Sequence, residues 1–311
     1  MTASALSGVL AVAHAPRSRW RVRGTWVAGG VLAVLVLVAI FAPLVAPYDP
    51  IAQPDIVRLK DLSPSWAHPF GTDAYSRDIL SRVIYGARIS LSVAALATLI
   101  TVTVGTAYGA LAGYVGGVVD SVLMRVVDAL LAIPRVLLLL ALLALWPALP
   151  LWLLVVTLGA TGWFGLSRLV RAQVLALRAQ DFVAAADALG ASGARILLRH
   201  ILPNVIPTVI VAATLGIGQV IVLEAGLSYL GMGVQPPAAS WGNIIQDGAD
   251  QIGSMWWVSL FPGLFIVTTA IACNALGDAL RDVLDPRARH LHPAGPLRAL
   301  REPRGAAPER A

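Results

Sequence analysis

The sequence predicts an all-α polytopic membrane protein with six transmembrane helices, and its composition supports this in three ways. Of 311 residues, 58% are hydrophobic and only 13% are charged, whereas soluble domains carry roughly a quarter charged residues. The mean hydropathy is +0.77. Several apolar runs have the length of about 20 residues that a helix needs to cross a bilayer. A membrane β-barrel would instead show short alternating segments, which the sequence lacks.

The N-terminal tail, 1–25, is basic and precedes the first apolar run, 26–45. Its arginines lie directly before that run, and the positive-inside tendency therefore places the tail in the cytoplasm. Pro43 and Pro47 should end the first span, since proline cannot continue a helix interior.

A polar segment of mixed charge, 48–88, separates the first span from the second, 89–114. We expect this segment on the outer side, with Asp73 capping a short helix that precedes the span. The second span carries glycines four residues apart, a pattern that lets helices approach closely. We interpret it as ordinary close packing of Gly105, Gly109 and Gly113.

The third and fourth spans, 121–146 and 151–166, should be joined by a tight outer turn. Pro134 should kink or interrupt the third span, and Arg125 is interpreted as an anchor at the membrane interface. Three further arginines after the fourth span mark the inner face: Arg168, Arg171 and Arg178.

The fifth and sixth spans, 208–230 and 258–276, flank an outer loop that has two acids and no Lys or Arg. Within this loop, WGNIIQDGA predicts a short surface helix. A basic tail, 281–311, follows the last span and belongs inside by the same tendency. The sequence thus predicts a six-helix domain over 26–280, with both termini in the cytoplasm.

The polar segment between the fourth and fifth spans, 181–207, predicts two short helices around Gly190. Asp181 and Ser192 are the expected caps, Gly190 is a natural helix stop, and Pro203 should end the second helix. The slim alanine surface could fit a groove on a partner. Alternatively, the arginines could hold the segment on lipid head groups, and the residues alone leave both interpretations open.

This segment resembles the EAA loop of permease subunits of ATP-binding-cassette (ABC) importers. Ala185 and Ala186 match its alanines, and a glycine and a Leu-Pro pair follow at the right positions. Ala184 replaces the Glu of the pattern, and His200 stands where the pattern has Ile. The resemblance implies a coupling helix that docks on an ATPase, with seven site residues: Phe182, Ala184, Ala185, Ala186, Gly190, Leu202 and Pro203.

Three other segments resemble the branch of that family that transports dipeptides, oligopeptides or nickel. They are HPFGTDAYSRDILSRVIYGARISL from His68, EAGLSYLGMGVQPPAASWGNII from Glu224 and GDALRDVLDPR from Gly277. The resemblance implies the type I importer fold, a cytoplasmic-membrane location, and peptide import with a second permease chain, two cytosolic ATPases that bind ATP and Mg, and an extracytoplasmic binding protein. The outer loop 231–257 is the expected surface for that binding protein. Nickel chelates or another small solute are the alternative cargo.

Residues that could carry chemistry are few. Lys60 is the only lysine, and no glycine loop precedes it, which excludes ATP hydrolysis by a P-loop in this chain. Glu224 and Ser228, late in the fifth span, are candidates for a contact with substrate or a gate, or for a buried hydrogen-bonded pair. His290 and His292 lack a third ligand, so we expect no metal and no cofactor in this chain.

The sequence argues against two other function classes. An ion-driven secondary transporter would need ionisable groups in several spans, and Glu224 is nearly alone. A membrane enzyme or scaffold would need clustered His or acidic residues at one membrane face, and we predict no enzyme active site. The arginines cluster at span ends, which indicates membrane topology rather than nucleic-acid binding.

Overall fold

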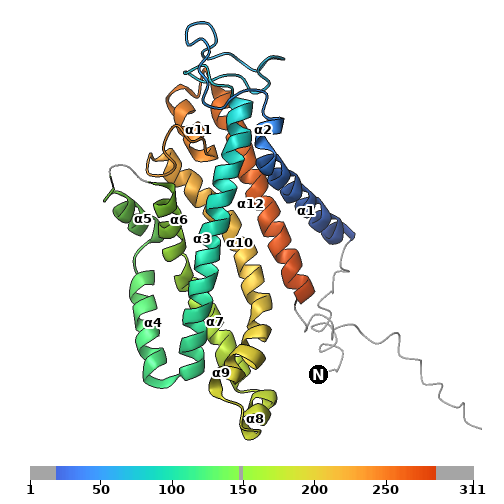
Figure 1. The fold of residues 1–311 in the computed structure, drawn as a ribbon, viewed down its shortest axis with the longest axis vertical. Helices are drawn as coiled ribbons and strands as arrows, with labels where there is room; N and C mark the ends of the chain where they lie inside the picture. Colours follow the sequence, from blue (N-terminus) through green and yellow to red (C-terminus); the bar gives the residue numbers. More distant parts are fainter. Residues whose placement is uncertain (1–18, 147–149, 285–311) are drawn as a thin grey trace, which may run out of the picture.

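The computed structural model describes residues 19–146 and 150–284. Within these ranges the regular elements are helices, accompanied by one isolated bridge between Thr72 and Asp78. The long helices lie side by side along the length of the molecule (Figure 1). The short helices α8 and α9 lie at one end, and α11 lies at the other.

Four helical stretches are long and apolar enough to cross a membrane. They are α3 (Ile79–Val115), α6 with α7 (Leu151–Ala160 and Trp163–Arg178), α9 through α10 (Gly193–Ile196, the π-helical turn Leu197–Ile201, and Leu202–Tyr229) and α12 (Trp256–Leu284). The pair α4 and α5 (Gly117–Leu131 and Arg135–Leu143) is a fifth candidate, bent by 80°.

The apolar part of α1 (Arg19–Ile40), Gly24–Ile40, is shorter than these stretches and is followed by the single turn α2 (Ala42–Val45). Length and composition therefore support four or five of the six predicted spans. Of the two terminal tails, residues 19–25 and 281–284 lie within the described part of the chain.

The second predicted span begins earlier than expected. Asp78, not Asp73, caps the helix, and its carboxylate accepts a hydrogen bond from Ser81 N at 2.8 Å. The predicted short helix is thus the first part of α3, which continues without a break into the span. Arg82 can remain inside this helix because its guanidinium donates to the Asp73 carboxylate at 2.6 Å.

The glycine pattern of α3 allows α7 to pack directly against its backbone. A Cβ at Gly113 would lie 2.9 Å from the Arg171 carbonyl oxygen, and one at Gly105 would lie 3.1 Å from that of Trp163. At Gly109 the added Cβ would collide with the Ser167 carbonyl. The prediction of close packing is confirmed.

The third and fourth spans are both broken. The break at 132–134 confirms the interruption predicted at Pro134. The fourth stretch continues past its expected end at 166 to Arg178. Arg171 does not end it because its guanidinium pairs with Asp120 of α4 through two contacts of 2.5 Å.

A buried ion-pair cluster joins the turn before α3 to α11 (Trp241–Gly248), at the upper end in Figure 1. Arg77 and Arg82 each donate to Asp73 at 2.6 Å and to Asp247 at 2.8 Å. The predicted helix over WGNIIQDGA is confirmed, but Trp241 is fully buried, so one face is packed rather than exposed. The 3-10 turn Ala249–Gln251 follows.

The glycine packing predicts a strong asymmetry between two Gly→Ala variants. Gly109→Ala should destabilise the protein by about 1–3 kcal/mol, because the added methyl group overpacks the α3–α7 contact. Gly165→Ala is the matched control, since no neighbouring heavy atom lies within 4 Å of its added Cβ. Thermal unfolding of the purified protein in detergent measures both, and equal midpoints would contradict this packing.

Candidate functional site

The polar segment 181–207 begins at one end of the bundle, where α8 and α9 lie (Figure 1). Helix α8 spans Asp181–Ala188, and Gly190, at φ +77°, ends it as predicted. The predicted cap at Asp181 is wrong: Gln180 holds the N-cap position, and Asp181 lies in the first turn, where a negative charge still favours the helix dipole. Ser192 holds the N-cap position of α9, without a side-chain capping bond.

Helix α8 has one packed side and one open side. Val183 is buried in a small core with residues of α7 and α10, and Ala186 packs against that core. Ala184 and Ala185 are exposed, and they are flanked by Phe182 (41% exposed) and Leu189 (88%). The open side is therefore a slim alanine surface between two large apolar side chains, which we call the α8 surface.

Sequence reasoning missed Leu189 as part of this surface. The spacing could have indicated it, because Leu189 follows Ala185 by four residues and Phe182 by seven. Residues at these spacings lie on one face of a helix.

Pro203 does not end a helix, contrary to the prediction. It lies in the first turn of α10, where the missing N–H is tolerated, and the π-helical turn 197–201 joins α9 to α10. Leu202 is half-buried and Pro203 is exposed. The fifth span accordingly begins before the predicted Thr208, and one helical stretch runs from Gly193 to Tyr229.

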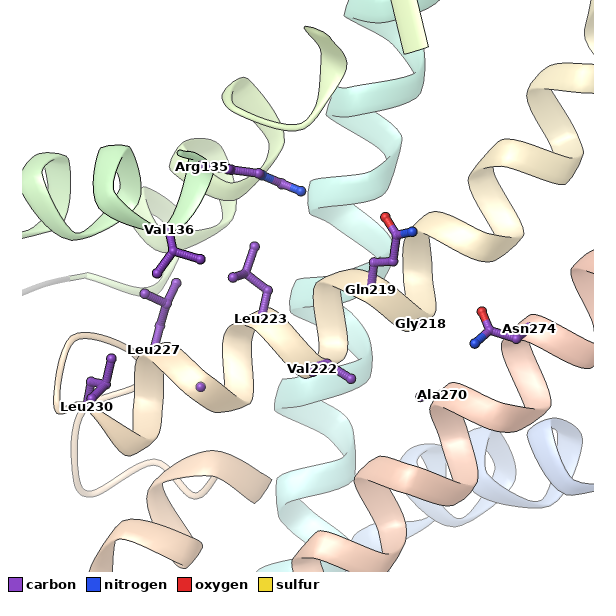
Figure 2. A pocket seen from close by; sticks show the side chains of 11 residues that line it. Arg135, Val136, Gly218, Gln219, Val222, Leu223, Leu227, Leu230, Ala270 and Asn274 are labelled. Carbon is purple, nitrogen blue, oxygen red and sulfur yellow. The ribbon is translucent and has the colours of Figure 1, made fainter. Parts of the chain in front are cut away.

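A pocket of about 550 Å³ lies farther along α10, between α5, α10 and α12. Its polar side chains are Arg135, Gln219 and Asn274; Figure 2 shows Gln219 between the other two. The remaining lining is apolar or glycine: Val136, Gly218, Val222, Leu223, Gly226, Leu227, Leu230 and Ala270.

Arg135 begins α5, directly after the break in the third span, and its guanidinium reaches the break between α6 and α7. It donates to the Leu158 carbonyl at 2.9 Å and, more weakly, to Thr161 Oγ1 at 3.4 Å. The two helix breaks are thus held together at the edge of the pocket.

Glu224 and Ser228 are fully buried beside this pocket but do not line it. Ser228 Oγ donates to Glu224 Oε1 at 2.7 Å, and Ser90 Oγ donates to Oε2 at 3.1 Å. Ser228 Oγ also accepts from Val234 N at 3.0 Å. The pair ties α10 to α3 and to the loop before α11, an arrangement that fits the buried alternative; a role as contact or gate stays a prediction.

Comparison with known proteins places this architecture in a family. Residues 105–290 match the model of the binding-protein-dependent transport system inner membrane component, and residues 21–64 match the N-terminal transmembrane domain of oligopeptide transport permease C. This chain belongs to the binding-protein-dependent transport permeases.

Similar curated proteins include several permeases, which supports this family assignment. The dipeptide transport system permease protein DppC of Bacillus subtilis is 41% identical, over 83% of this chain and 80% of its own length. The oligopeptide transport system permease protein OppC of the same organism is 39% identical, over 83% and 84%. OppC of Haemophilus influenzae is 43% identical, over 71% of each chain.

Within the described part of this permease, no group of three or more His, Cys, Asp or Glu side chains could hold a metal ion. His290 and His292 lie outside that part. Cys273 is buried in α12.

Two substitutions at Glu224 separate a structural role from a gating role. Glu224→Ala should lower the thermal midpoint of the permease, because it opens a cavity and leaves the Ser90 and Ser228 hydroxyls without their buried partner. Glu224→Gln keeps the volume and one acceptor oxygen, and its amide NH2 can donate to a serine hydroxyl that turns to accept. It should retain most of the transport per folded molecule. A Glu224→Gln protein with normal stability and no transport would instead establish a gating role.

Proposed function

We propose that this chain is the transmembrane permease subunit of an ATP-driven importer of di- and oligopeptides. In this proposal it forms half of the translocation path and receives peptides from an extracytoplasmic binding protein. The observation that carries the proposal is the family match across most of the chain, with relatives at about 40% identity whose names specify dipeptide or oligopeptide transport.

The α8 surface is the proposed docking site for a cytosolic ATPase. Its small residues allow close approach, and Phe182 and Leu189 supply apolar area that water would otherwise surround. ATP and Mg would be bound by two such ATPase subunits. In this proposal the α8 end and both termini lie on the cytoplasmic side of the bacterial cytoplasmic membrane, which the arginine-rich segments support.

The helical stretch from Gly193 to Tyr229 provides a mechanical link. It begins beside the α8 surface and carries the pocket-lining residues from Gly218 to Leu227 at its far end. A displacement of α8 and α9 by ATPase closure would therefore move one wall of the pocket. Two packings of such helices, favoured by different nucleotide states, would give alternating access.

A second, similar permease chain would cover the open side of the pocket. Gln219 and Asn274 are exposed in the single chain, although they lie on helices that are apolar enough to span a membrane. The binding protein would approach the opposite end, where α11 and the turn before α3 lie (Figure 1).

ATP dependence tests the proposed function against its alternatives. The permease, reconstituted in liposomes with its partner chains, should take up labelled di- and oligopeptides only with ATP and the binding protein. Uptake driven by a proton or sodium gradient without ATP would indicate a secondary transporter. ATP-driven uptake of nickel chelates without peptide uptake would reassign the cargo.

Two substitutions at one position test the α8 surface. Ala185→Trp should reduce ATP-driven uptake at least tenfold while the permease still reaches the membrane, because a bulky side chain holds the ATPase away from α8. Ala185→Ser keeps the slim surface and is the matched control. Uptake and ATPase activity are measured in the same vesicles, and wild-type uptake by Ala185→Trp would disprove this docking surface.

A further inference from the structure

Arg135 is the one cationic side chain among the residues that line the pocket, and it is half-buried. Its hydrogen-bond partners are neutral: the Leu158 carbonyl and the Thr161 hydroxyl accept its hydrogen bonds. Within the described residues, no carboxylate lies within 4.0 Å of its guanidinium nitrogens.

A charge at membrane depth is costly without a partner of opposite sign. Two acceptors leave part of the guanidinium fork, which has five N–H donors, open for another acceptor. Arginine binds carboxylates in a planar, two-point arrangement. The charge and the open donors therefore call for an anionic ligand with a carboxylate.

The rest of the pocket fits a peptide that ends in such a carboxylate. The amides of Gln219 and Asn274 can each donate to and accept from a peptide backbone. Figure 2 shows Arg135 and Asn274 on opposite sides of Gln219: Asn274 points toward α10, and the Arg135 guanidinium ends beside α3. The apolar walls contact variable side chains without selecting among them by hydrogen bonding, and the volume of about 550 Å³ lies within the range of known ligand pockets, roughly 300–1,000 Å³.

We propose that Arg135, with Gln219 and Asn274, forms a transient binding site for the C-terminal carboxylate of the peptide as it passes the permease. This inference rests on the proposed function. The polar groups recognise the features that all such peptides share, and the walls tolerate their differences. Arg135 also joins the two helix breaks. The side chain that would bind the peptide carboxylate therefore also holds the two broken helices in place.

The test compares a labelled tripeptide that has a free C-terminal carboxylate with the same tripeptide as its C-terminal amide. Uptake per intact complex is measured in liposomes, with the binding protein saturated by either peptide. Any preference of the binding protein affects wild type and variant equally, so it cancels when their acid-to-amide uptake ratios are compared.

Arg135→Gln should lower the acid-to-amide uptake ratio about tenfold or more, as expected for loss of a charge-assisted hydrogen bond. Arg135→Lys should restore part of the ratio. Arg125→Gln is the control, because Arg125 is an exposed cation of α4 that does not line the pocket; its ratio should equal that of wild type.

Equal losses for both peptides in Arg135→Gln would overturn the proposal and leave Arg135 with a purely structural role. If Arg135→Gln does not assemble, Asn274→Asp decides: its added negative charge should repel the acid but not the amide, and an unchanged ratio would overturn the proposal. A wild-type complex that imports neither peptide would overturn the proposed function, and this inference with it.

Discussion

The close approach of α3 and α7 is the constraint on which the rest of this structure depends. Three glycines on α3 leave room for the α7 backbone and for the side chains of Leu166, Val170 and Val174, which lie directly against them. Helix α7 leads directly into α8, and the core beneath α8 includes Ala110 of α3 together with Val170 and Val174 of α7. The orientation of the α8 surface is therefore set by a contact deep in the bundle rather than by α8 itself.

At the opposite end of the bundle, buried ion pairs hold the elements together. Burying two arginines is costly unless their charges and hydrogen bonds are satisfied, and here Asp73 and Asp247 satisfy them jointly. Because Asp247 belongs to α11, the cluster fixes that helix to the start of α3. It also weakens the expected acidic character of loop 231–257, since Asp247 is already paired while Asp250 remains exposed.

Apolar runs in the sequence were sufficient to predict a polytopic helical fold, and Pro134 and Gly190 were correctly placed at breaks. The errors at two arginines have one physical origin: a single sequence does not reveal the partners of a charge. Arg82 and Arg171 were expected outside membrane helices. Within helices they pair with Asp247 and Asp120, acids that are distant in sequence. Pro203 was read as a stop because the preceding π-helical turn was not foreseen. The pocket could not be predicted, since three separate helices build it.

Ala184 replaces the Glu of the EAA pattern. The interaction energy lost with that charge can be compared with the energy that apolar contact on the α8 surface still offers. An exposed ion pair contributes about 0–1 kcal/mol, and Ala184 is exposed. Complete burial of a leucine side chain contributes about 1.5–3 kcal/mol, and Leu189, 88% exposed in the single chain, has nearly all of that area still to bury. Phe182 adds part of its own. Apolar contact at Leu189 and Phe182 can thus more than offset the absent charge, provided that Ala185 stays small enough for the proposed ATPase partner to reach both.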